Sequence, residues 1–118
     1  MSDGRLRQTM LLDFYGELLT EKQRLCMDLH YNEDLSLAEI AEQCGISRQG
    51  VWDNIRRGES ALADIEEKTG LLRRFEENRS ALEKIREQIK ALAAMSQGEA
   101  RDKALKAAED IAAVIARG

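Results

Sequence analysis

The side chains best suited to chemistry in this sequence lie at the start of a helix that is expected to follow Ser47. Arg48 and Gln49 come directly after this serine, whose hydroxyl group can cap the helix by accepting a hydrogen bond from a backbone N–H group. In a groove of nucleic acid, arginine can form two hydrogen bonds with guanine, and glutamine can form two with adenine. The chemistry predicted for these residues is therefore the recognition of base edges.

Further residues of the same helix could extend this surface. Arg56 and Arg57 lie two turns further on, where a helix that leaves a groove passes the phosphate backbone. Asn54 could touch a base or a phosphate, and Trp52 could either pack on the edge of the domain or stack on a partner or a base. Asp53 counts against this interpretation, because its carboxylate would repel phosphates.

The helix that carries these residues is expected to belong to a helix-turn-helix motif spanning residues 36–57. Ser36 is a second candidate N-cap, so the helix starts after Ser36 and Ser47 would both offer free N–H groups to phosphates. Gly45 can adopt the left-handed conformation that ends a helix. The alternatives are a plain helical hairpin, and a helix-turn-helix that serves only as a scaffold for protein docking.

Apolar residues at helical spacing predict the core of the motif, with Ile40, Val51 and Ile55 at its centre. The second helix is expected to continue as far as Gly70, because its apolar stripe extends beyond the motif. Gly58 weakens this helix by about 1 kcal/mol relative to alanine, so a bend or a break at this position is compatible with the sequence.

Two more helices are expected before the motif, after a start at residues 1–4 that is predicted to be disordered. The first of these helices covers roughly residues 5–16. The second begins after Thr20, which is followed three residues later by Gln23, and this pattern is typical of a capping box.

From residue 71 the apolar residues follow a heptad repeat with charged residues on the other faces. A turn at residues 96–98 is expected to separate this helix from a last one at about 99–116. The C-terminal third is therefore either a hairpin within one chain or a seam that pairs with a second copy, and we expect a homodimer. The predicted seam consists of Leu71, Phe75, Leu82, Ile85, Ile89 and Leu92.

The composition indicates an all-α protein, because proline is absent, 43% of the residues are hydrophobic and 34% are charged. The net charge is −4, whereas a dedicated DNA-binding domain is usually basic. Cys26 and Cys44 fall on apolar helical faces and are interpreted as small buried hydrophobic residues. No apolar segment has the length of a signal peptide or a membrane span, and a cytoplasmic location fits these features.

Residue patterns typical of enzymes are absent from the sequence. The single histidine, His30, has no acid or cysteine at a suggestive offset, and no glycine-rich phosphate loop or metal-ligand spacing occurs. The adjacent acids Glu66 and Glu67 diverge on a helix and are interpreted as solvated charges. We therefore expect no catalytic site, no metal and no cofactor.

Residues 19–62 resemble region 4 of bacterial sigma factors, through a Leu-Thr-x-x-Gln start, a Leu-Ser-x-x-Glu-Ile-Ala helix and a Gly-Ile-Ser turn. More closely, the chain is similar to the YlxM family of small bacterial helix-turn-helix proteins. This similarity covers roughly residues 6–75 and is carried by the segments LLDFYGELLTEKQ, LAEIAE and SRQGVWDNIRR, followed by a charged helical tail. Gly50 and Trp52 stand where the resemblance leads us to expect alanine and tyrosine.

The resemblance implies a sigma-region-4-like module in residues 1–70 and a charged, dimerising helical arm in residues 71–118. Members of this family are typically encoded beside genes of the signal recognition particle, and they are regarded as regulators or accessories of that pathway. The resemblance thus implies a non-enzymatic protein that binds DNA or signal recognition particle RNA. The alternative is a module that docks on signal recognition particle proteins without touching nucleic acid. No membrane partner is expected.

Overall fold

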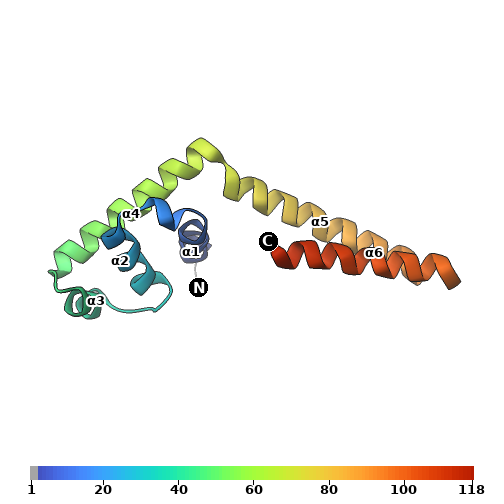
Figure 1. The fold of residues 1–118 in the computed structure, drawn as a ribbon, viewed down its shortest axis with the longest axis horizontal. Coiled ribbons are helices and arrows are strands. Elements are labelled where there is room, and N and C mark those ends of the chain that lie inside the picture. The colour runs from blue at the N-terminus through green and yellow to red at the C-terminus, as the bar shows by residue number, and fades with distance from the viewer. Residues whose placement is uncertain (1–2) are drawn as a thin grey trace. The chain divides into compact units, whose positions relative to one another are not determined.

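The protein is all-α in a computed structural model that describes residues 3–118, with no β-strand among these residues. The all-α fold with a helix-turn-helix is therefore confirmed. The contacts between residues divide the chain into two compact units, and the boundary in the sequence falls between Leu72 and Arg73. The elements are α1 (Asp3–Tyr15), the short 3-10 helix η1 (Gly16–Leu18), α2 (Glu21–Tyr31), α3 (Leu37–Cys44), α4 (Arg48–Thr69), α5 (Leu71–Ala94) and α6 (Gly98–Arg117) (Figure 1).

The start of the chain differs in part from the prediction. Residues 1–4 were expected to be disordered, but α1 begins at Asp3, so residues 3 and 4 are helical. Residues 1 and 2 lie outside the described part of the chain. Neither of the next two residues is a proline, so the backbone N–H groups and dihedral angles allow the helix to start there.

The first unit is built around α4, which packs against α1, α2 and α3 (Figure 1). The residues predicted for its centre are buried: Ile40 and Val51 are fully covered, and Ile55 is 5% exposed. Leu11 and Leu62 are also buried and join α1 and the C-terminal half of α4 to the same core. Burying each of these side chains contributes roughly 1.5–3 kcal/mol, so the unit has a substantial core of its own.

Gly58 does not bend or break α4, which is continuous from Arg48 to Thr69. Its role is to let α2 approach closely. A Cβ atom at position 58 would lie 2.5 Å from the Sδ atom of Met27, whose side chain is fully buried. The cost of a helical glycine is therefore offset by close packing between two helices.

The local signals at the ends of α2 and α4 are those predicted from the sequence. Thr20 and Gln23 form a complete capping box, in which the Gln23 N–H donates to Thr20 Oγ1 and the Thr20 N–H donates to Gln23 Oε1, both at 3.2 Å. Gly70 ends α4 with a φ of 62° in the left-handed region. These features fix where α2 begins and where α4 ends.

One buried carboxylate joins α1, α4 and the first turn of α5. Glu66 is 7% exposed, and its Oε1 atom accepts a hydrogen bond from the Tyr15 hydroxyl at 2.5 Å and from the Leu72 N–H at 3.0 Å. The interpretation of Glu66 as a solvated charge was wrong. Its partners come from two other helices, so the pattern on α4 alone could not reveal them.

The second unit consists of the rest of α5 and of α6, which run side by side in opposite directions (Figure 1). Residues of α5 between positions 75 and 87 and residues between positions 112 and 118 line the same surface hollows. Ala93 and Ala108 are the buried residues among 73–118. None of the helices within residues 3–118 is both long enough and apolar enough to span a membrane.

The predicted seam is only partly covered within one chain. Leu71, Ile85 and Leu92 are 46%, 43% and 57% exposed, whereas Phe75, Leu82 and Ile89 are half-buried. The intrachain hairpin is thus present, and pairing of the seam with a second copy stays a prediction.

Candidate nucleic-acid interface

The first helix of the motif, α3, begins at a capping box. The Glu39 N–H donates to Ser36 Oγ at 3.1 Å, and the Ser36 N–H donates to Glu39 Oε1 at 2.9 Å. The bond from the Ser36 backbone lowers the pKa of the Glu39 carboxyl, and the serine side chain lowers it further. The start of α3 is therefore fixed by residues of its own first turn.

The turn between α3 and α4 depends on one glycine. Gly45 follows Cys44 with a φ of 67°, in the left-handed region, and its N–H donates to the Ala41 carbonyl. Nothing lies within 4 Å of the place where its Cβ would stand, so the backbone conformation alone requires glycine here. Ser47 then caps α4, as predicted.

The starts of α3 and α4 meet at one shallow hollow on the surface. The serine caps occupy the N–H groups of Glu39 and Gly50, the third residue of each helix. The N–H groups of the two preceding residues in each helix are not used by the helix itself, and two positive helix ends favour an anion such as a phosphate. The hollow is lined by Ser36, Leu37, Ala38, Arg48, Gln49 and Trp52.

The polar side chains on α4 differ in how free they are to bind a ligand. Gln49 donates from Nε2 to Asp53 Oδ1 at 3.1 Å, and Asn54 donates from Nδ2 to the Gly50 carbonyl at 2.8 Å. Both amides are thus engaged within α4. Arg48 is exposed and forms no hydrogen bond or ion pair with any residue from 3 to 118, so its guanidinium is available.

Trp52 lies on the outer surface of α4 and not in the core. Its side chain is 43% exposed. The guanidinium of Arg56, one turn further on, lies over the indole ring at 4.9 Å from the ring centre, in a cation–π contact. An exposed aromatic ring and two arginines therefore share the face of α4 next to the hollow.

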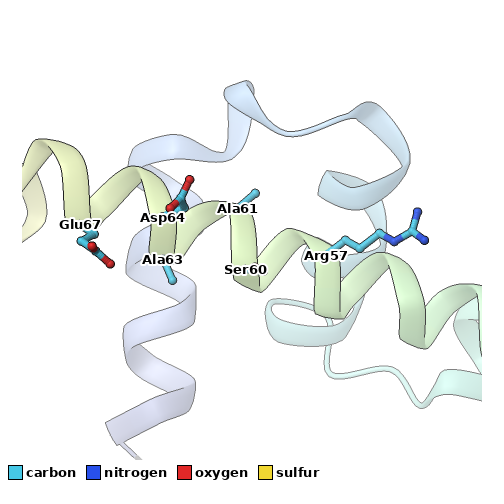
Figure 2. Close-up of a pocket in the computed structure, with 6 residues that line it drawn as sticks. All are labelled: Arg57, Ser60, Ala61, Ala63, Asp64 and Glu67. Carbon is cyan, nitrogen blue, oxygen red and sulfur yellow. The ribbon is translucent and has the colours of Figure 1, made fainter.

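The run of arginines along α4 from the hollow ends at Arg57. A second shallow hollow follows along the helix, and Figure 2 shows the Arg57 guanidinium pointing away from the carboxylates of Asp64 and Glu67. Asp64 is paired with Lys68 at 3.3 Å. The two carboxylates would repel a phosphate backbone, which bounds the candidate interface at Arg57. The hollow is lined by Arg57, Ser60, Ala61, Ala63, Asp64 and Glu67 (Figure 2).

The structure gathers half of the site residues predicted from the sequence around the first hollow and places the others beside it. Sequence reasoning missed Leu37 and Ala38, which follow the cap of α3 and line the hollow. It also missed the Ser36–Glu39 capping box, although the Ser-x-x-Glu pattern could have revealed it. The residues around the hollow are Ser36, Arg48, Gln49 and Trp52, whereas Ser47 caps α4, and Asn54, Arg56 and Arg57 lie further along α4.

The cysteines do not form a metal site. Among residues 3–118, no three His, Cys, Asp or Glu side chains are grouped so that they could hold a metal ion. Cys26 is buried as expected, but Cys44 is only half-buried. Burial raises the pKa of the Cys26 thiol, and the nearby Cys44 raises it further, so Cys26 is a poor nucleophile.

Comparison with known families agrees with this geometry. Residues 2–101 match the model of the UPF0122 family, which is described as "Putative helix-turn-helix protein, YlxM / p13 like". The chain belongs to the UPF0122 family. The resemblance to YlxM proteins stated from the sequence is thereby confirmed, and the match to UPF0122 covers α1 to α5 but only the start of α6.

UPF0122 proteins of several bacteria are similar to this chain. The relative from Halalkalibacterium halodurans is 49% identical over 89 residues, which cover 75% of this chain and 82% of the relative. The relative from Thermoanaerobacter sp. is 45% identical over 112 residues, or 95% of this chain and 93% of the relative. The relative from Acetivibrio thermocellus is 46% identical over 101 residues, or 86% of each chain.

Proposed function

We propose that this UPF0122 protein is a non-enzymatic, cytoplasmic accessory or regulatory protein that binds nucleic acid through the surface formed by the starts of α3 and α4. The link to the signal recognition particle is part of this proposal and rests on the resemblance to YlxM proteins. The observation that carries the binding proposal is the hollow at which two helix N-termini and the unengaged guanidinium of Arg48 converge.

Charge limits how this surface can bind. The whole chain has a net charge of −4, and Asp64 and Glu67 follow directly after the interface along α4. Only Arg48, Arg56 and Arg57 are available as cations on the proposed face. A contact with roughly three phosphates gives a log–log salt slope of about −2 to −3, which is shallow for a DNA-binding protein.

Position on α4 assigns different roles to these arginines. Arg48 lies in the first turn, which enters a groove or loop, so we expect it to contribute specificity. Arg57 extends away from α4 (Figure 2), and Arg56 lies two turns after the helix start. We expect Arg56 and Arg57 to contribute affinity by contacting phosphates, with little dependence on base sequence.

The runner-up function is a module that docks on signal recognition particle proteins without touching nucleic acid. It is favoured by the exposed ring of Trp52 and by the engagement of the Gln49 amide with Asp53, since aromatic residues are frequent at protein interfaces. In that case, changes at Arg48 or Trp52 would disrupt capture of a signal recognition particle protein and leave nucleic-acid binding at a weak baseline.

We also propose that the protein acts as a homodimer through residues 71–118. The support is the row of exposed apolar side chains on α5, including Ile85 and Leu92, which two helices of one chain leave in contact with water. Sedimentation equilibrium at micromolar concentration should give twice the 13.3 kDa of one chain. A monomer under these conditions would contradict dimerisation but would not affect the interface on α3 and α4.

The test of the binding function is a titration of the full chain with duplex DNA and with signal recognition particle RNA. Arg48→Ala should weaken binding to a preferred target by about 1–3 kcal/mol and change binding to a random sequence little. Equal binding of Arg48→Ala and the wild type to every nucleic acid, together with loss of capture of a signal recognition particle protein, would replace this function with the docking function.

A further inference from the structure

Trp52 is the only tryptophan of the chain, and it lies where a nucleic acid would meet the α3–α4 surface. Its ring lines the hollow formed by the starts of α3 and α4, yet 43% of the side chain remains exposed. A large aromatic ring gains free energy when an apolar or aromatic surface covers it. Hydrogen bonds from arginines to a nucleic acid would not require an exposed aromatic ring on this surface, so the ring needs a separate explanation.

The indole ring is held in place by its neighbour on the same face of α4. The Arg56 guanidinium lies 4.9 Å from the ring centre and covers part of the ring through a cation–π contact. The ring also borders the hollow, where Arg48 begins the helix one turn earlier. A ring that is oriented in advance and flanked by cations is the arrangement on which proteins stack the bases of single-stranded nucleic acids.

The two amides that could read the edges of paired bases each use one N–H donor within α4. The Gln49 amide donates to Asp53 at 3.1 Å, and the Asn54 amide donates back to the Gly50 carbonyl at 2.8 Å. Reading a duplex in its major groove depends on such amides and on arginine. Of these groups, Arg48 alone makes no hydrogen bond within the described residues 3–118, and the face adds an aromatic ring for which a regular duplex offers no free base face, because paired bases already stack on each other.

The negative charge of the chain favours the same kind of target. With few cations on the face, contacts with phosphates alone give limited affinity. Stacking between a base and an aromatic ring adds affinity without any change in charge, and it tolerates different bases. An acidic protein with one exposed tryptophan beside two arginines is therefore better suited to an unpaired strand than to a duplex.

We infer that Trp52 stacks on an unpaired base, so that the ligand of the α3–α4 surface is a single-stranded or looped segment of nucleic acid and not regular duplex DNA. This inference rests on the proposed nucleic-acid-binding function. The base covers the indole ring beside the hollow, and the guanidinium of Arg48 contacts the edge of a neighbouring base.

Because Trp52 is the single tryptophan, its fluorescence reports the contact directly. The full chain is titrated with a single-stranded RNA of mixed sequence, with a single-stranded DNA of the same sequence, and with the corresponding duplex DNA. Both single strands should quench the fluorescence as they bind, and the duplex should bind at least about tenfold more weakly with little quenching. The two single-stranded titrations show whether the ribose changes the affinity. Equal quenching by the duplex would overturn the inference.

Variants at position 52 separate stacking from a structural role. Trp52→Leu should weaken binding of a labelled single strand roughly 5- to 100-fold, whereas Trp52→Tyr keeps a stacking ring and should stay within about threefold of the wild type. Leu18→Ser changes another exposed apolar residue, on η1, and serves as the matched control with unchanged binding. Unchanged thermal unfolding of all three variants excludes a general loss of fold.

The outcomes for this inference and for the proposed function can be told apart. Loss of binding in Arg48→Ala with full binding in Trp52→Leu would overturn the stacking inference and leave the proposed function standing. No binding of the wild type to any of the three nucleic acids would overturn both.

Discussion

The two units of this protein differ in whether they bury large apolar side chains. The first unit covers a set of large side chains completely, with Leu11, Met27 and Ile40 at or near zero exposure, although others such as Leu18 and Leu25 lie on its surface. In the second unit, alanines are the buried residues among 73–118, and large side chains such as Ile85 and Leu105 are 43% and 40% exposed. Several helices packed around α4 can enclose a core, whereas two helices side by side leave one face of each in water.

The helix ends show the same difference. Each of α2, α3 and α4 begins with a serine or threonine whose side chain accepts a backbone hydrogen bond. In contrast, α6 begins after Gln97, which makes no side-chain capping bond. The first unit thus carries its own stabilising features, while the second is expected to depend on contacts from outside the chain, which is the reason for proposing a dimer there.

The test with the largest expected effect on stability replaces an isoleucine by alanine in each unit. Ile40→Ala should destabilise the protein by roughly 2–5 kcal/mol, because it opens a cavity in a fully covered core. Ile85→Ala, on the exposed face of α5, should cost less than about 1 kcal/mol in the monomer and should instead weaken dimerisation. Urea unfolding measures both losses, and equal losses would mean that the two units do not differ as described.

The next test compares two neighbouring acids at the end of α4. Glu66→Ala removes the acceptor of the Tyr15 hydroxyl and of the Leu72 N–H. It should cost roughly 1–3 kcal/mol, because the buried Leu72 N–H is left without a partner, whereas the Tyr15 hydroxyl keeps its hydrogen bond with Thr69 Oγ1. Glu67→Ala is the matched control on the exposed face and should stay within about 0.5 kcal/mol of the wild type. Similar effects at the two positions would show that the carboxylate of Glu66 does not hold α1, α4 and α5 together.

A smaller effect tests why α4 contains a glycine in its middle. Gly58→Ala should destabilise the protein by about 1 kcal/mol, because the clash with Met27 outweighs the gain in helix propensity. In a Met27→Ala background the clash is gone, and the same change should become stabilising by up to about 1 kcal/mol. Ser60→Ala, an exposed position on the same helix, provides the control. If Gly58→Ala stabilises the wild type, α2 and α4 are not as tightly packed as the structure indicates.

Features that depend on nearby residues could be predicted from the sequence. The caps at Thr20, Ser36 and Ser47 and the left-handed turn at Gly45 involve residues within a few positions of each other. The burial of Ile40 follows from its spacing within one helix. Each of these features is determined by the chemistry of a single turn or a single helix face.

Features that depend on contacts between distant helices could not be predicted. Glu66 is buried because Tyr15, far away in the sequence, donates to it. Gly58 is required because Met27 packs against it from α2. In the candidate site, the positions of Arg48 and Trp52 followed from the helix start, but the hollow between them depends on how α3 meets α4.

The salt dependence of nucleic-acid binding tests most directly the claim that the α3–α4 surface of the first unit is the binding surface. The wild type bound to a single-stranded target should show a log–log slope of about −2, and Arg56→Ala combined with Arg57→Ala should make that slope shallower by about 1.5. Arg73→Ala combined with Arg74→Ala, on α5 in the second unit, should leave the slope unchanged. A wild-type slope near zero, or a slope that changes with the arginines of α5 and not with those of α4, would contradict the account.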